Sequence, residues 1–235
     1  FQDDSKIRII GENAFSNTSI ESFKLPYKIT RISRQTFDSC HNLQNVIIPI
    51  NSELQAIENN AFRNTSIKSI TFPSKLSELG NEWCHITTQL NEINVVQNNP
   101  YFKNFDKFII GKSNPNNQDF DELVFAMRDI TDAIIPDFIK EIKPYAFSCS
   151  SIKKISFSSN TIQICEYAFY YCKNLRKVDF PTNSKLEQIG ILSFTSCAID
   201  AFKIPSHVKS INQGTFALCN FLRKFEIPDD SELER

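Results

Sequence analysis

The sequence lacks several features that define common protein classes. Its 235 residues contain no run of eighteen or more apolar side chains, so no transmembrane helix lies within this chain. Lysine and arginine total 26 and aspartate and glutamate 27, so bulk charge indicates neither a polyanion nor a membrane surface as the partner. A hydrophobic fraction of 41%, including 21 phenylalanines, is enough to fill a narrow continuous core.

Residue types that usually carry catalysis are few and scattered. The three histidines, His41, His85 and His207, fall at unrelated positions. The sequence also lacks a phosphate-binding glycine loop, a Cys-x-x-Cys pair and a Gly-x-Ser-x-Gly motif. We therefore expect no catalytic residue, no metal and no cofactor, and predict that the protein is not an enzyme.

The sequence consists instead of one repeated unit. Each copy has an anchor residue, with an aliphatic residue five positions before it. Successive anchors lie 22 or 25 residues apart, except for one step of 63 between Cys84 and Phe147. A fixed period in the twenties is typical of a solenoid. The anchors are Phe15, Phe37, Phe62, Cys84, Phe147, Phe169, Phe194 and Phe216.

Each copy predicts one coil. Leu43, Val46 and Ile48 occupy the first, fourth and sixth positions of a segment, which is the strand pattern of a leucine-rich repeat. Pro49 follows and ends strand pairing because proline has no N–H group. A second short extended piece then leads to the aliphatic residue, and a short helical or 3₁₀ turn is expected from there to the anchor. The predicted fold is a leucine-rich repeat solenoid, an α/β horseshoe.

Recurring motifs resemble the BspA-like leucine-rich repeats of bacterial and protist surface proteins. Ile10-Gly11 precedes Ala14-Phe15, and the Ala-Phe pair recurs at Phe62, Phe147 and Phe169. The resemblance covers essentially the whole chain. It implies a cell-surface or secreted protein that attaches to host matrix proteins or to other cells. Cysteines three residues past their anchors carry the same pattern: Cys40, Cys172, Cys197 and Cys219.

The repeat predicts a single solenoid over residues 1–235. Residues 1–10 and 227–235 both match the inside of a repeat, so we expect a segment of a longer protein, without caps at its ends. One island, about residues 97–129, interrupts the array between the coils at 90–96 and 130–136.

The island has the pattern of a β-hairpin. Two β-type runs, 107–110 and 123–127, flank a polar turn rich in asparagine. It is interpreted either as a decoration covering a sheet edge or as a ligand-contacting loop. Its possible contact residues are Tyr101, Phe102, Phe105 and Phe108.

The seven cysteines leave two alternatives open. Residues at one repeat position stack from coil to coil, so Cys172, Cys197 and Cys219 should form a column. They are either small buried hydrophobes with inert thiols or partners in disulfides between coils, and the odd total prevents complete pairing.

Two glycosylation sequons begin at Asn17 and Asn64, at the same repeat position. We expect both on an outer turn, where a glycan fits if the chain is secreted. Inheritance of the position by repeat duplication is an equally good explanation.

The predicted working surface is the concave strand face. Side chains alternate along a strand, so the second, third and fifth positions should face outward. From Lys153 onward these positions hold seven cations and three anions, a stripe that suits an acidic protein segment or a sulfated glycan. Alternatively, the cations keep an exposed sheet soluble. The predicted contacts are Lys153, Lys154, Ser156, Arg176, Lys177, Asp179, Lys203, Arg223, Lys224 and Glu226.

Two functions follow from these features. The first is a non-enzymatic surface protein that adheres to a protein or glycan through its concave face. The second is an intracellular interaction scaffold with the same fold. Aromatic side chains are scarce on the outward positions, so nucleic acid is not expected as a partner. The sequence does not indicate the oligomeric state.

Overall fold

The computed structural model describes residues 5–114, 116 and 118–234, which form short β-strands joined by tight turns. The chain divides into two compact units, Phe1–Ile109 and Ile110–Arg235. The boundary falls inside the predicted island. Each unit is described separately, as unit 1 and unit 2.

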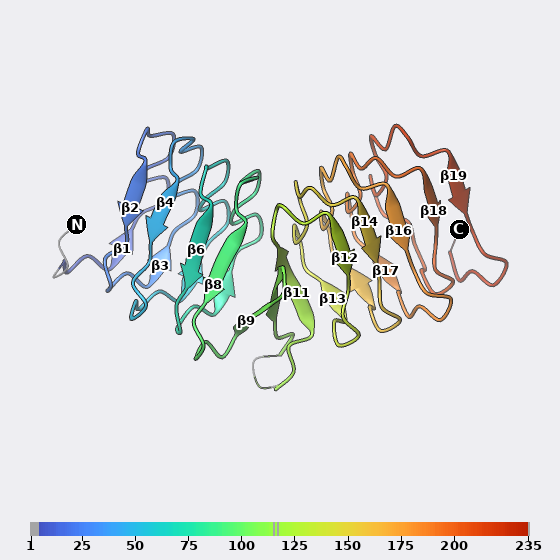
Figure 1. Cartoon of the computed structure of the whole chain (residues 1–235), viewed down its shortest axis with the longest axis horizontal. Helices are drawn as coiled ribbons and strands as arrows, with labels where there is room; N and C mark the ends of the chain where they lie inside the picture. Colours follow the sequence, from blue (N-terminus) through green and yellow to red (C-terminus); the bar gives the residue numbers. More distant parts are fainter. Residues whose placement is uncertain (1–4, 115, 117, 235) are drawn as a thin grey trace. The chain divides into compact units, whose positions relative to one another are not determined.

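Unit 1 carries two parallel sheets with one strand of each in every coil (Figure 1). The front sheet has the order β2 (Ser22–Lys24), β4 (Asn45–Ile47), β6 (Ser69–Phe72) and β8 (Glu92–Val95). The side sheet has the order β1 (Ile9–Ile10), β3 (Arg31–Ile32), β5 (Ala56–Ile57) and β7 (Glu78–Leu79). Phe23 pairs with Val46 across the front sheet, so equivalent repeat positions are in register.

Unit 2 repeats this arrangement. Its front strands are β12 (Asp132–Ile134), β14 (Lys154–Ser156) and β16 (Lys177–Asp179), followed by the pair β18 (Ala201–Lys203) and β19 (Lys224–Glu226). Its side strands are β11 (Glu122–Ala126), β13 (Glu141–Ile142), β15 (Gln163–Ile164) and β17 (Gln188–Ile189). A parallel bridge from Ile189 to Ile211 extends the side sheet by one more coil.

The predicted alternation along the front strands is confirmed. Leu43, Val46 and Ile48 are buried, whereas Gln44 and Asn45 are exposed. In unit 2, Ile152 and Ile155 are fully buried on either side of exposed lysines, whereas the corresponding Leu222 and Phe225 of the last front strand are only half-buried. The outward positions of each front sheet therefore form continuous rows that cross the strands.

The anchor phenylalanines stack into columns within each unit. Phe15, Phe37 and Phe62 have ring centroids 5.4 and 5.3 Å apart, with planes 5° from parallel in both pairs. Phe169 lies between Phe147 and Phe194 at 4.7 and 5.0 Å. These columns confirm the repeat register that the anchor spacing predicts, and they form the centre of each core.

The predicted helical turns are wrong, because the described residues contain no α- or 3₁₀-helix. The residues two before and two after each anchor adopt the left-handed conformation, with φ between 55° and 64°. Two left-handed residues only four apart are incompatible with a right-handed helical turn. The fold is therefore a β-solenoid rather than an α/β horseshoe. The left-handed positions are Asn13, Asn17, Gln35, Ser39, Asn60, Asn64, Glu82, Ile86, Tyr145, Cys149, Tyr167, Tyr171, Leu192, Ser196, Gly214 and Leu218.

Hydrogen bonding in the turns explains this conformation. In the first coil the N–H groups of Asn13, Phe15 and Asn17 donate to carbonyl groups of the next coil, at 2.8 to 3.2 Å. The intervening N–H groups close tight turns within their own coil, as from Ser16 to Asn13 at 3.0 Å. A helix would keep all of these bonds within one coil. The observed turns instead form an additional ladder that ties neighbouring coils together.

The position three past the anchor holds a small hydrogen-bond donor. The Sγ atoms of Cys40, Cys172, Cys197 and Cys219 each donate to the carbonyl of the anchor in the preceding coil, at 2.9 to 3.2 Å. In another coil the Thr65 hydroxyl donates to the carbonyl of its own anchor at 3.1 Å. The predicted thiol column is therefore present, and the thiols cap carbonyl groups inside the core.

The island contributes strands on both sides of the unit boundary. β10 (Phe108–Gly111) and β11 confirm the two predicted runs to within a residue, and part of the turn between them lies outside the described residues. The sequence did not indicate β9 (Phe102–Phe105), which is a neighbour of β10. In unit 1 the buried Asn99 side chain donates to the carbonyls of Pro73 and Leu76, at 2.7 and 3.0 Å. The start of the island is thus bonded to the last coil of unit 1.

One buried hydroxyl gives a direct stability prediction. Ser193 is fully buried and its Oγ has no hydrogen-bond partner among the described residues, whereas the Thr36 hydroxyl at the same repeat position donates to the Ser33 carbonyl at 2.7 Å. Ser193→Ala should therefore raise the free energy of unfolding by about 1 kcal/mol, and Thr36→Ala should lower it by a similar amount. Urea denaturation of both variants tests these two expected changes in the free energy of unfolding. Destabilisation by Ser193→Ala would contradict the assignment.

Candidate functional site

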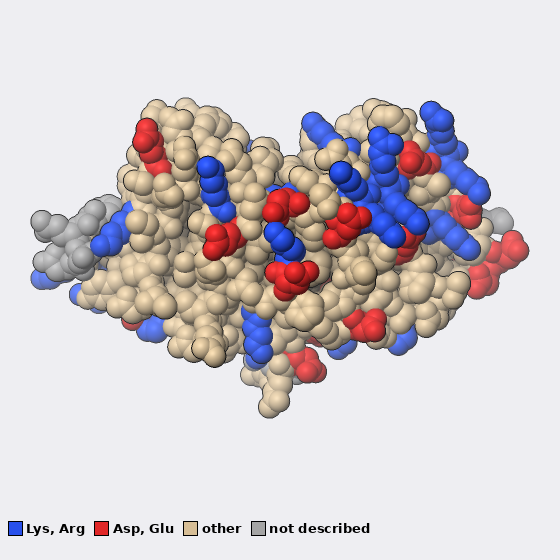
Figure 2. All heavy atoms as spheres, viewed as in Figure 1, with Lys and Arg blue, Asp and Glu red and all other residues tan. Residues whose placement is uncertain are grey.

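The outward side chains of β14, β16, β18 and β19, with the residue before each strand, form a surface that we call the basic face. It is made of Lys153, Lys154, Ser156, Arg176, Lys177, Asp179, Asp200, Ala201, Lys203, Arg223, Lys224 and Glu226. All seven of its cations are exposed. Figure 2 shows lysine and arginine side chains gathered over these strands, with carboxylates between them.

Backbone pairing sets the basic face in three rows across the strands. One row contains Lys153, Arg176, Asp200 and Arg223, which are linked by backbone N–H donation from each residue to the one before it, at 2.9, 3.4 and 3.0 Å. In the next row Lys154 is in register with Lys177, and Ala201 with Lys224. In the third, Ser156 pairs with Asp179, and Lys203 with Glu226. The structure thus places all ten predicted contact residues on one surface of unit 2.

Ion pairs divide the seven cations into two groups. Lys154 and Lys177 share the Asp179 carboxylate at 3.7 and 3.3 Å. Lys224 pairs with Glu226, and this hydrogen bond raises the pKa of Lys224 and lowers that of Glu226. The remaining cations form no ion pair among the described residues. These four unpaired cations are Lys153, Arg176, Lys203 and Arg223.

The front sheet of unit 1 differs in charge. Its outward positions carry Glu21, Lys24, Lys68 and Glu92, and most of the others are amides or hydroxyls. Positive and negative charges therefore balance on this sheet, and the cationic excess is confined to unit 2.

The structure separates the predicted island contacts. Phe102 and Phe108 are only 7% and 3% exposed, and Phe102 packs against Phe72 with ring centroids 5.7 Å apart. These two residues offer no surface to a ligand, because an aromatic side chain in a strand turns inward when it extends the core. Phe105 is exposed and Tyr101 is half-buried, so only these two remain available.

Both sequon asparagines lie on turns, as expected. Asn17 is exposed and Asn64 is half-buried. Each occupies a left-handed position, with φ of 58° and 57°. Asparagine tolerates this conformation better than most residues, which is a structural reason for its presence that is independent of glycosylation.

All seven cysteines are free thiols in the structure, which favours the inert-thiol alternative over disulfides. Burial raises the pKa of Cys197 and of Cys219. Burial also raises the pKa of Cys165, and the Glu141 carboxylate that accepts its S–H at 3.0 Å adds to the effect. These thiols remain protonated at neutral pH and are poor nucleophiles.

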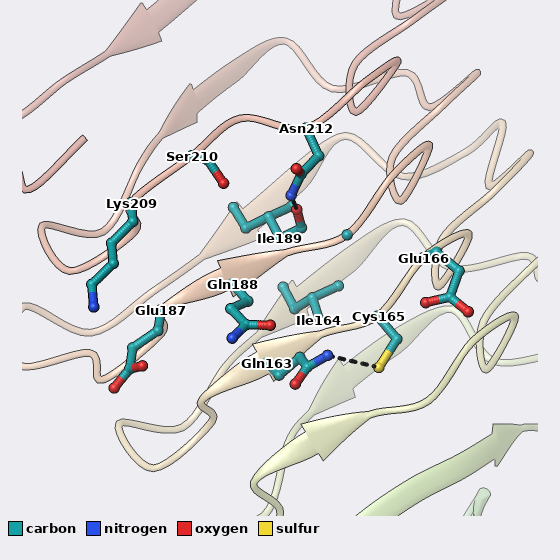
Figure 3. Close-up of a pocket in the computed structure, with 11 residues that line it drawn as sticks. Gln163, Ile164, Cys165, Glu166, Glu187, Gln188, Ile189, Lys209, Ser210 and Asn212 are labelled. Atoms are coloured by element: carbon teal, nitrogen blue, oxygen red, sulfur yellow. Dashed lines mark hydrogen bonds between the residues drawn. The ribbon is translucent and has the colours of Figure 1, made fainter. Parts of the chain in front are cut away.

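A polar hollow of about 370 Å³ opens on the side sheet of unit 2 (Figure 3). Gln163 and Gln188 lie side by side on β15 and β17, with Glu187 and Lys209 along one edge. The Gln163 amide donates to Cys165 Sγ at 3.5 Å. The hollow offers amide and charged groups for hydrogen bonding, but its only thiol is the raised-pKa Cys165.

Within the described residues, no group of three or more histidine, cysteine, aspartate or glutamate side chains is placed to hold a metal ion. No helix long and apolar enough to cross a membrane is found in the same residues.

Sequence reasoning located the basic face but missed which of its cations are paired. Asp179 lies on the strand next to that of Lys154, two residues after Lys177 on β16, and this placement follows from register. The repeat register therefore indicates that these groups are neighbours, but not that their side chains reach one another. Nothing in the sequence indicated the polar hollow, because its lining residues come from the same positions of three repeats and no single repeat carries a recognisable binding motif.

Known proteins with similar sequences or structures are leucine-rich repeat proteins, in agreement with the fold. The BspA type leucine rich repeat region matches in six copies, over residues 8–110, 85–189 and 140–233. The pneumococcal vaccine antigen PcpA has a similar structure, with a TM-score of 0.82 and 19% identity over 100% of this chain and 62% of that one. No protein in the curated set matches the sequence.

Two bacterial repeat proteins are similar as well. A leucine-rich cell surface protein from Faecalibacterium prausnitzii A2-165 has a TM-score of 0.69 and 21% identity, over 88% of this chain and 60% of that one. A leucine-rich repeat protein from Eubacterium ventriosum ATCC 27560 has a TM-score of 0.74 and 20% identity, over 96% and 71%. At these identities the likeness establishes the fold alone, and this chain spans about three fifths of the first two structures. With six repeat copies matched along nearly its whole length, the chain belongs to the BspA-type leucine-rich repeat family, whose members are generally non-enzymatic binding scaffolds.

Proposed function

We propose that the protein is a cell-surface or secreted adhesin that binds matrix or cell-surface macromolecules through the basic face. The observation that carries the proposal is the gathering of seven exposed cations, against three carboxylates, on the front strands of unit 2 in a chain whose net charge is −1. A rigid sheet with ordered charged rows presents a broad surface at little entropic cost on binding. A surface location is supported by the similar protein from F. prausnitzii, which is described as a cell surface protein.

Charge reversal tests the proposal. The variant Lys153→Glu/Lys154→Glu/Arg176→Glu/Lys177→Glu should weaken binding of the chain to immobilised matrix or to whole cells by about tenfold or more, because it replaces attraction by repulsion over two coils. Binding is measured by surface plasmon resonance or flow cytometry. Circular dichroism should remain unchanged, because all four side chains are exposed.

A matched control separates the face from bulk charge. Arg8→Glu/Lys24→Glu/Lys28→Glu/Lys68→Glu makes the same change in net charge, but in unit 1. This control should change the affinity by less than about twofold relative to the unmodified chain, since these residues lie outside the basic face. Equal loss in both variants would reject the basic face as the binding surface, and so would retention in both.

A second function, an intracellular interaction scaffold, is favoured by one observation. All seven cysteines are free thiols, a state that reducing compartments preserve. The test expresses the chain through a secretory pathway and measures, by mass spectrometry, whether the peptides containing Asn17 and Asn64 carry a glycan. Occupied sequons on protein isolated from its native source would exclude the intracellular function.

A further inference from the structure

We propose that the ligand of the basic face is a sulfated glycan chain lying across the strands, along the row Lys153, Arg176, Asp200 and Arg223. This inference rests on the proposed function and specifies the chemistry of its partner. It is carried by the ion-pair pattern, the spacing of the row and the near absence of apolar side chains on the face.

The ion-pair pattern shows where an anion can bind without displacing another. Lys154, Lys177 and Lys224 already contact Asp179 or Glu226. Among the described residues, Lys153, Arg176 and Arg223 have no carboxylate oxygen within 4.0 Å, unlike the three paired lysines of the face. An incoming anionic group therefore gains charge-assisted hydrogen bonds in this row without breaking existing ones.

The spacing of the row favours a chain with closely spaced anionic groups. Neighbouring coils lie about 4.8 Å apart, so the row from Lys153 to Arg223 extends over about 14 Å. An acidic peptide in extended conformation presents same-side carboxylates only every 6.6 Å or so, about twice the rise per residue. Such a peptide loses register with the coils, whereas a densely sulfated chain carries several anionic groups on each pair of sugars and can place one near each cation.

The composition of the face disfavours a folded protein partner. Among its twelve outward side chains only Ala201 is apolar, and none is aromatic. Stable protein interfaces depend on a few buried aromatic or aliphatic anchors surrounded by a polar rim. A ligand recognised mainly through charge and hydrogen bonds suits this surface better.

The first test uses the unmodified chain and defined probes. Heparin oligosaccharides should bind, and the same oligosaccharides after chemical desulfation should bind at least about tenfold more weakly. Affinity should fall steeply as salt increases from 50 to 300 mM. Chains long enough to cross the four coils should bind more tightly than a heparin disaccharide. Equal binding of desulfated heparin would overturn the proposal, as would tighter binding of polyglutamate or of duplex DNA.

Two variants test the row. Lys153→Gln/Arg176→Gln/Arg223→Gln should raise the dissociation constant for heparin about tenfold or more. The control Lys173→Gln/Lys185→Gln/Lys209→Gln removes the same number of positive charges from unit 2, outside the basic face. This control should change the dissociation constant for heparin less than threefold. Asp200→Asn removes the one anion of the row and should tighten binding. Similar losses in both triple variants, or weaker binding by Asp200→Asn, would contradict the row as the site.

Cell binding separates this inference from the proposed function. Treating cells with lyases that degrade heparan, chondroitin and dermatan sulfates should abolish attachment of the unmodified chain. If attachment survives the lyases but still depends on the basic face, the glycan inference is rejected and the proposed function stands. If no surface is bound at all, both are rejected.

Discussion

Phe169→Ala is expected to lower the free energy of unfolding by about 4 kcal/mol, because a fully buried phenylalanine is replaced by a side chain that leaves a large cavity. Phe169 is also stacked on both faces, against Phe147 at 4.7 Å and Phe194 at 5.0 Å. Each stacked pair contributes about 0.5 to 1.5 kcal/mol beyond the burial of area. The neighbouring coils are held at their spacing by backbone ladders, so they cannot collapse to fill the cavity.

The measurement is urea denaturation followed by circular dichroism, combined with amide hydrogen exchange. Loss of protection should concentrate in unit 2, where the Phe169 column lies. Phe221→Ala is the matched control, because Phe221 is 52% exposed. This substitution should lower the free energy of unfolding by less than about 1 kcal/mol. A similar loss in both variants would show that the anchors are not the packed centre of the core.

The anchor column is the part of the fold that the sequence predicts best. The steps from Phe15 to Phe37 and from Phe37 to Phe62 differ by three residues, yet the ring distances are 5.4 and 5.3 Å. Two of the three extra residues lie in the turn after Pro49, and the third lies between Phe37 and Leu43, before the front strand. Spacing in sequence therefore translates into register, because additional residues are absorbed in surface turns.

The turns were mispredicted because their left-handed residues are varied. Asn13 and Asn17 are typical of positive φ, but Tyr145 and Leu192 occupy equivalent positions. A β-ladder formed by turns gains hydrogen bonds only when neighbouring coils are present. This stabilisation is tertiary, so local sequence preference does not reveal it.

For the candidate site, the sequence was sufficient to predict which side chains face outward. Strand periodicity placed Lys153 and Arg176 on the front sheet, because alternation is a property of the backbone. Which cations remain unpaired depends on side-chain reach across strands, as in the pairing of Lys154 with Asp179. This information requires three-dimensional coordinates.

Gly190→Ala is expected to destabilise unit 2 by about 2 to 3 kcal/mol, because the added methyl group meets the backbone of the preceding coil. A Cβ atom at Gly190 would lie 2.3 Å from the Glu166 nitrogen and 2.5 Å from the Cys165 carbonyl carbon. Both are backbone atoms, which cannot rotate away as a side chain can. Relief requires the coils to separate, and separation lengthens the hydrogen bond from Gly190 N–H to the Ile164 carbonyl, now 2.8 Å.

Gly11 provides the control, since it occupies the same repeat position and no atom of the described residues lies within 4 Å of the Cβ that alanine would add there. Gly11→Ala should be neutral or stabilise slightly by restricting the unfolded chain. Urea denaturation compares the two variants, and hydrogen exchange at Gly190 and its neighbours locates the effect. If Gly190→Ala were as well tolerated as Gly11→Ala, the side sheet would have to be looser than its hydrogen bonds indicate. If Gly11→Ala were the more damaging, the glycine requirement would arise from the backbone of the turn rather than from contact between coils.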